Sequence, residues 1–241
     1  MSRPNCLARE SRLSQMTSVA ATTLLLATLS FPVAAQKAPA ASLPAPVAKG
    51  APLSGVTADL FQMIDLDRAS EVRATLLRGA KVDATDDRGD HALLVAARSG
   101  SLPVVQVLVD AGAKVNLRNK WGDTALMVAA LNGQEGIVRY LRAKGADINN
   151  AGWSALHYAS VNGHANVVRY LLDQGGNPVA ASPNGVTPLM MAARENKTEV
   201  MKVLLEYGAD PAQKNDKGET AYDWAVREEH TTAIDLLKKL R

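Results

Sequence analysis

Four histidines and Ser154 are the residues whose sequence context most invites comparison with a catalytic or metal-binding site. A metal site needs ligands spaced four residues apart on one helix, or close to carboxylates, and His91, His157, His164 and His230 lack such an arrangement. Ser154 lies in Gly-Trp-Ser-Ala-Leu, which begins like a hydrolase nucleophile elbow but lacks its closing glycine and preceding strand. The sequence also contains no phosphate-binding or dinucleotide-binding glycine motif. It therefore predicts no enzyme activity, no cofactor and no metal.

The segments that carry these residues recur along the chain. Five turn glycines are spaced by 33, 30, 33 and 33 residues, and they are Gly89, Gly122, Gly152, Gly185 and Gly218. After each glycine come an apolar stretch with a pair of small residues, usually Ala-Ala, and a second apolar run. A repeat of this length is one helical hairpin that cannot bury its own apolar face, so several copies must stack into a solenoid.

Two copies show which family the repeat resembles. The copy at Gly152 reads Trp-Ser-Ala-Leu-His-Tyr-Ala, and the next contains Thr187-Pro188-Leu189, three of the four letters of the Thr-Pro-Leu-His signature of ankyrin repeats. Over roughly residues 56–241 the chain resembles the ankyrin repeat family. The resemblance implies an all-α ankyrin-repeat solenoid of stacked helix-turn-helix units with short β-hairpin-like turns. It also implies that His157, at the signature position, bonds the backbone of a neighbouring unit.

The other three histidines differ in how they relate to the positions of the ankyrin repeat. His164 follows the glycine between the two helices of its unit, which is again a position typical of the family. His91 and His230 lie at positions of the repeat that are not equivalent to each other. We therefore expect all four histidines to be structural.

Local signals mark where the units begin and end. Hydroxyl residues before the first apolar stretch are expected to cap the first helix, and glycines after the second run are expected to end the second helix in a left-handed conformation. We predict a degenerate first unit over 56–83, four full repeats over about 84–213 and a closing unit over 214–241. The expected caps are Thr124, Ser154, Thr187 and Thr220, and the expected terminating glycines are Gly112, Gly145, Gly175 and Gly208.

The first 35 residues have the composition of a secretory signal peptide. Three arginines precede an apolar run over residues 19–29, and Val33-Ala34-Ala35 supplies the small residues expected before a cleavage site. We expect cleavage after Ala35; the alternative is an uncleaved membrane anchor, for which the run is short. Residues 36–55, which are rich in Pro and Ala, are predicted to be a disordered linker.

Removal of residues 1–35 changes the charge and the cysteine content. It leaves 24 basic and 23 acidic residues, without a basic stripe that would favour nucleic acid or acidic lipid. It also removes Cys6, the only cysteine, so the mature chain contains no disulfide and tolerates an oxidising compartment. An exported, cysteine-free chain resembles bacterial periplasmic members of the family. We expect a periplasmic or secreted monomer with no membrane span after signal cleavage.

Members of the family usually bind proteins through their turn tips and the adjacent face of the first helices. At these positions the middle units carry apolar residues and the end units carry charges, as in an interface with an apolar centre and a polar rim. The alternative is that both tryptophans pack onto neighbouring turns. We predict a partner-binding centre at Trp121, Trp153, Leu131 and Val161, accompanied by Asp123, Asn132, Asn162 and Val186.

One irregularity overlaps this predicted surface. The connection from Asn149 to Gly152 is three residues shorter than that from Asn116 to Gly122. The shorter connection either opens a notch beside Trp153 or is a neutral deletion in a surface loop.

These features favour non-enzymatic protein binding in the bacterial periplasm, as a scaffold, an adaptor or a protective partner of another exported protein. Two alternatives stay open. One is an inhibitor or immunity-type protein that blocks a specific enzyme, and the other is an effector secreted from the cell. The sequence does not identify the protein partner.

Overall fold

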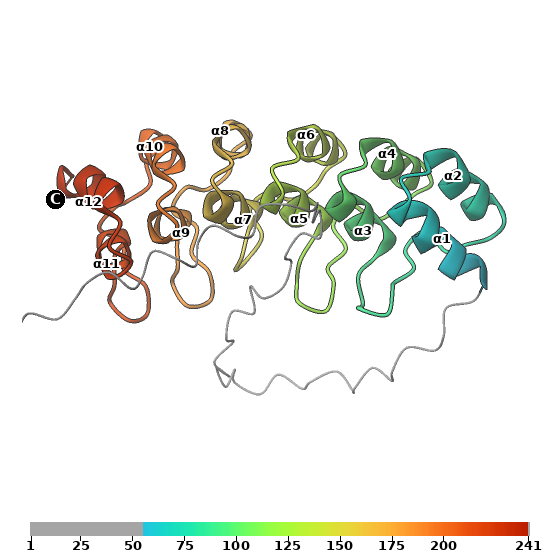
Figure 1. Ribbon diagram of the computed structural model, residues 1–241, viewed down its shortest axis with the longest axis horizontal. Coiled ribbons are helices and arrows are strands. Elements are labelled where there is room, and N and C mark those ends of the chain that lie inside the picture. Colours follow the sequence, from blue (N-terminus) through green and yellow to red (C-terminus); the bar gives the residue numbers. More distant parts are fainter. Residues whose placement is uncertain (1–54, 241) are drawn as a thin grey trace, which may run out of the picture. The chain divides into compact units, whose positions relative to one another are not determined.

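The computed structural model describes residues 55–240, which fold into 12 α-helices arranged as six antiparallel pairs (Figure 1). The predicted signal peptide and the predicted linker up to residue 54 lie outside the described residues. Gly55, which we placed in the linker, is the first residue of the first helix. The predicted all-α ankyrin-type solenoid is confirmed by this architecture.

The helices form two rows. The first helices of the pairs lie in the row from which the long connections project, and the second helices form the other row (Figure 1). The first helices are α1 (Gly55–Asp65), α3 (Ala92–Ser99), α5 (Ala125–Leu131), α7 (Ala155–Asn162), α9 (Pro188–Arg194) and α11 (Ala221–Arg227). The second helices are α2 (Ala69–Leu77), α4 (Leu102–Asp110), α6 (Glu135–Ala143), α8 (Ala165–Asp173), α10 (Thr198–Glu206) and α12 (Thr231–Lys238).

The first helices pack against one another through their small residues. The pairs Ala96-Ala97, Ala129-Ala130 and Ala192-Ala193 are fully buried. Small side chains allow neighbouring helices to approach closely and leave room for the leucines beside them. In α1 the bulkier Ile64 takes this place and is also fully buried. This larger residue is accommodated because only α3 flanks α1 within its row (Figure 1).

The helix ends follow the predicted signals. The hydroxyl of Thr124 accepts a hydrogen bond from the N–H of Met127 at 3.3 Å, and Thr187 and Thr220 cap α9 and α11 in the same way. The Ser154 hydroxyl instead bonds Nδ1 of His157 at 2.9 Å. The four predicted terminating glycines have φ between 86° and 90°, which a residue with a Cβ rarely adopts. Each of these signals acts within one unit, so they were visible in the sequence.

Polar side chains close the connections between units. In the α4–α5 connection, the side-chain oxygen of Asn119 accepts hydrogen bonds from the N–H groups of Trp121 and Asp123 at 3.0 and 2.9 Å. The Asn119 N–H also donates to the Asp123 carbonyl at 3.0 Å, as in a hairpin. Asn215 closes the α10–α11 connection in the same manner. In the described chain, the only residues paired as a β-bridge are Thr85 and His91, so the turns are hairpin-like without forming a sheet.

All four histidines bond a backbone carbonyl of a neighbouring unit. Nε2 of His157 lies 3.0 Å from the Val186 carbonyl, which confirms the contact implied by the family signature. Nε2 of His164 lies 2.9 Å from the Leu131 carbonyl, and Nε2 of His230 lies 2.9 Å from the Arg194 carbonyl. His164 and His230 therefore occupy one repeat position, an equivalence that we did not recognise in the sequence. His91 reaches the Arg118 carbonyl at 3.1 Å.

His157 is held in its neutral form. The side chain is fully buried, and burial lowers its pKa to about 4 against the opposing effect of its backbone hydrogen bonds. The neutral tautomer with the proton on Nε2 satisfies both neighbours, since Nε2 donates to Val186 and Nδ1 accepts from the Ser154 N–H at 3.3 Å. A proton on Nδ1 would place an uncompensated charge in the core.

The free energy of unfolding should therefore fall as the pH is lowered from 7 to 4. In the unfolded chain His157 binds a proton below about pH 6.5, whereas the folded state excludes it until about pH 4. This difference removes up to about 3 kcal/mol of stability across that window. Urea unfolding at a series of pH values would measure it, and His157→Gln should lack this component of the pH dependence. His91→Gln serves as the control for loss of a histidine; an unchanged pH profile in His157→Gln would contradict the assignment.

Candidate protein-binding surface

The two predicted tryptophans lie in different environments. Trp121, at the tip of the α4–α5 connection, is 62% exposed. The Lys120 ammonium lies 4.2 Å from the centroid of its ring, so a cation–π contact holds the ring at the surface. Trp121 thus matches the prediction of an exposed aromatic residue at a turn tip.

Trp153 instead matches the packing alternative. Its ring is half-buried, packs against the hydrophobic core and meets the His157 ring edge-to-face with centroids 5.3 Å apart. The contact places Trp153 over the buried histidine that links its unit to the next. Our two interpretations of the tryptophans therefore each describe one of them.

Two of the predicted surface residues are in the core. Val161 is 5% exposed and Val186 is 2% exposed, so neither side chain offers contact area to a partner. Val161 is buried because α7 packs between α5 and α9. Val186 is buried beside the cap of α9, where its N–H bonds the Ser182 hydroxyl and its carbonyl bonds His157. This corrects the prediction that both valines form part of the surface.

The remaining predicted residues lie between neighbouring units and are partly used by them. Leu131 is partly buried against the core, and its carbonyl accepts hydrogen bonds from the side chains of Asn162 at 2.7 Å and His164 at 2.9 Å. Asn132 reaches the Arg98 carbonyl at 3.4 Å. These two asparagines lock adjacent units together, and Asn162 remains exposed enough to contact a partner as well.

Asp123 is bound to the next unit through Tyr158. The Tyr158 hydroxyl donates to the Asp123 carboxylate at 2.6 Å. Burial, together with this hydrogen bond, raises the pKa of Tyr158 far above its ordinary value, so the phenol stays protonated. The carboxylate and the phenol therefore form a fixed polar contact two residues after Trp121 in the sequence.

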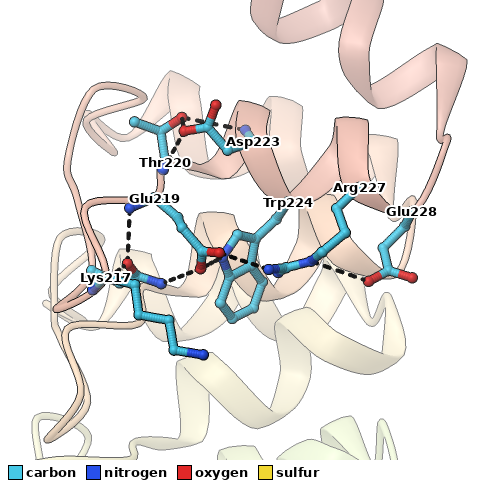
Figure 2. Close-up of polar contacts among 8 residues, drawn as sticks. Lys217, Glu219, Thr220, Asp223, Trp224, Arg227 and Glu228 are labelled. Atoms are coloured by element: carbon cyan, nitrogen blue, oxygen red, sulfur yellow. Dashed lines mark hydrogen bonds and ion pairs between the residues drawn. The ribbon is translucent and has the colours of Figure 1, made fainter.

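The end units replace this apolar centre with ion pairs. In the closing unit, Glu219 accepts hydrogen bonds from Asn215 at 2.9 Å, from the Trp224 indole at 2.8 Å and from Arg227 at 2.7 Å (Figure 2). The bond from Asn215 is the main cause that lowers the pKa of Glu219, and those from Trp224 and Arg227 add to it against the opposing effect of burial. Figure 2 also shows Arg227 reaching Glu228, at 3.7 Å.

The α3 unit carries the equivalent pair at the other end. The Asp90 carboxylate, 1% exposed, pairs with Arg98 at 2.5 Å and accepts from Asn119 at 2.8 Å. Asp90 and Arg98 are eight residues apart, as are Glu219 and Arg227. At the arginine position the α5 and α7 units carry Leu131 and Val161 instead. The α5 and α7 units therefore have no arginine at this position, but of the two apolar residues there only Leu131 is partly exposed, since Val161 lies in the core.

Residues 55–240 contain no group of three or more His, Cys, Asp or Glu side chains placed to hold a metal ion. Within the same range, no helix is both long enough and apolar enough to cross a membrane.

A comparison with protein families decides the classification. A family model described as ankyrin repeats (3 copies) matches residues 65–151, 93–182 and 177–240. The chain belongs to the ankyrin repeat family. Ankyrin repeats are generally protein–protein interaction modules, and the fold is a non-enzymatic interaction scaffold. No significant match was found among curated proteins.

Solved ankyrin repeat structures resemble this one along most of their length. The ankyrin repeat domain of human ASB11 is 27% identical, with a TM-score of 0.67 over 74% of this chain and 81% of that one. The ankyrin repeat domain of Bcl-3, a member of the IκB protein family, is 29% identical, with a TM-score of 0.64 over the same shares. These neighbours support the fold and the general class of protein binding.

Single substitutions of the two tryptophans in this ankyrin repeat protein should distinguish the exposed side chain from the packed one by their effects on the free energy of unfolding. Trp153→Ala should lower the free energy of unfolding by about 2 kcal/mol, because a half-buried ring loses part of the ~3–5 kcal/mol of a fully buried one. Trp121→Ala should change it by less than about 0.5 kcal/mol, as for other surface substitutions. Urea denaturation measures both, and equal losses in the two variants would contradict the assignment.

Proposed function

We propose that this ankyrin repeat protein binds a protein partner through the apolar middle of its repeat surface and performs no catalysis of its own. The observation that carries the proposal is Trp121, a large aromatic residue that is 62% exposed at a connection tip. Tryptophan is enriched among residues whose truncation weakens binding by about 2 kcal/mol or more. Leu131, Asp123 and Asn162 extend the surface from this tip along the first helices.

We further propose that binding takes place in the bacterial periplasm or outside the cell, after removal of residues 1–35. The charged start, the short apolar run and the small residues before Gln36 support export, and the absence of cysteine after Cys6 suits an oxidising compartment. The partner is then another exported protein, for which this chain acts as a scaffold, an adaptor or a protective partner. The partner-binding region is proposed to lie within residues 56–241. The protein is proposed to act as a monomer.

Capture of the partner should depend on Trp121. The parent protein, Trp121→Ala and Leu77→Ala are immobilised and exposed to periplasmic extract. Leu77 is the matched control because it is 84% exposed on α2, away from the proposed surface. A protein retained by the parent and by Leu77→Ala should bind Trp121→Ala at least about tenfold more weakly when the purified pair is measured by calorimetry.

The same experiment separates the alternatives. Equal binding of all three forms would place the interface elsewhere and contradict the proposed surface. If the captured protein is an enzyme, a loss of its activity that reaches completion at one equivalent would favour an inhibitor or immunity-type protein over a scaffold. Recovery of the chain from culture medium would favour a secreted effector.

Export should produce a mature chain that begins at Gln36. The cut is expected after Val33-Ala34-Ala35 because signal peptidase requires small residues at the first and last of these positions. Cell fractionation followed by N-terminal sequencing measures the compartment and the cleavage site, and Ala35→Arg should accumulate uncleaved precursor while Ala41→Arg should not. A chain found in the cytoplasm with an intact N-terminus would contradict the proposed export.

A further inference from the structure

The shortened α6–α7 connection leaves a hollow beside the proposed surface. In Figure 1 this connection projects less far than those on either side of it. The hollow has a volume of about 400 Å³ and is lined mainly by polar residues, with Arg118, Arg142, Asp147, Asn149, Asn150 and Gln174 among them. It does not include Trp153, beside which we had expected a notch. The hollow that accompanies the deletion is therefore lined by residues other than Trp153.

The deletion removed the tip of the connection but kept the contact that joins the units. The side-chain oxygen of Asn149 accepts from the Asn177 N–H at 2.9 Å and its amide donates to the Gly175 carbonyl at 2.8 Å. Asn116 makes the equivalent contacts one unit earlier, to Asp147 and Gly145. The units thus remain joined through Asn149 at the start of the connection. The residue equivalent to Asn119, which closes the α4–α5 connection, is missing.

Two arginines converge on this hollow without an acidic partner. Among residues 55–240, no carboxylate lies within ion-pair distance of either guanidinium. Arg142 makes one long bond, from a terminal nitrogen to the Ala146 carbonyl at 3.4 Å, and its buried Nε has no hydrogen-bond partner. Arg118 donates to the Gly122 carbonyl at 3.0 Å and, with the Asn150 amide suitably turned, to its oxygen at 2.9 Å. Donor capacity in the hollow therefore exceeds the acceptors that the protein supplies.

We propose that this hollow binds a carboxylate of the protein partner, supplied by an acidic side chain or by a chain terminus. A guanidinium presents its donors as a planar fork that matches a carboxylate in two parallel hydrogen bonds. Arg118 lies three residues before Trp121 on the same connection, so an anchored carboxylate and the exposed aromatic ring can engage one partner segment. This inference rests on the proposed function, whose partner it describes chemically.

The charge of Asp147 predicts the direction in which a substitution should change carboxylate binding. Its carboxylate lines the same hollow and is exposed, and it makes no ion pair with Arg118 or Arg142. A second carboxylate entering the hollow would be repelled by Asp147 and attracted by the arginines. Removing the charge of Asp147 should therefore tighten carboxylate binding, whereas removing that of Arg142 should weaken it.

A titration with small probes tests the site without any partner. The ¹⁵N-labelled protein is titrated at pH 7 and constant ionic strength with N-acetylglutamate α-amide, which carries a side-chain carboxylate, or with N-acetylglycine, which carries a terminal one. N-acetylglutamine amide is the neutral control. At least one carboxylate probe should give saturable shifts at the backbone N–H groups of Asn149 to Ala151, with at least tenfold higher affinity than the neutral probe. The stronger of the two acids identifies the source of the carboxylate.

Variants make the result decisive. Arg142→Gln should weaken binding of the stronger probe at least tenfold, and Asp147→Asn should tighten its binding severalfold. If circular dichroism shows that Arg142→Gln does not fold, Arg118→Gln takes its place. Equal shifts with the neutral probe, no effect of either arginine variant, or an equal response to inorganic phosphate would overturn the proposal. Because no partner is used, a failed capture experiment and a failed titration remain distinguishable.

Discussion

The close approach of the first helices is the constraint on which the rest of this structure depends. It favours small residues where two first helices touch, and buried alanine pairs supply them in α3, α5 and α9. Once the helices are this close, the connections between pairs must also lie beside one another. Asn119 reaches Asp90, and the Asp216 N–H reaches the Asn184 carbonyl, across adjacent connections. The helix row therefore determines which connection residues are neighbours.

Hydrogen bonds to main-chain carbonyls then fix each unit against the next. Side chains of His164 and Asn162 share the Leu131 carbonyl, and His230 takes the equivalent Arg194 carbonyl. These carbonyls lie at or near the ends of first helices, where the backbone has no partner within its own helix. Histidine and asparagine thus supply the missing donors between units, which explains why residues suited to catalysis are structural here.

Apart from the His157 contact that the family signature implied, sequence reasoning succeeded where a feature belongs to one unit and failed where it depends on two. Caps such as Thr187 and terminating glycines such as Gly145 act locally, so their residue types predicted the observed geometry. Val186 is buried where its carbonyl bonds His157 of the preceding unit, and Val161 is buried between helices on both sides. Trp121 precedes its turn glycine and Trp153 follows its own, so the two tryptophans occupy different positions of the repeat. In the α3 unit the residue before the turn glycine, Arg88, is exposed, whereas the residue after it, Asp90, is buried. Our prediction treated both positions alike, and the ring of Trp153 in addition packs against that of His157.

The difference between the α5 unit and the charged closing unit follows from one pair of repeat positions. Where both are charged, as in Glu219 and Arg227, the arginine also lies over the Trp224 ring, 5.3 Å from its centroid, and the carboxylate accepts a hydrogen bond from the indole N–H. Where the arginine is replaced by Leu131, Asp123 must find another donor, and it takes the phenol of Tyr158 from the next unit. Loss of the ion pair thus creates both an apolar position and a contact between units. A surface built in this way can be less charged at its middle without leaving a carboxylate unsatisfied.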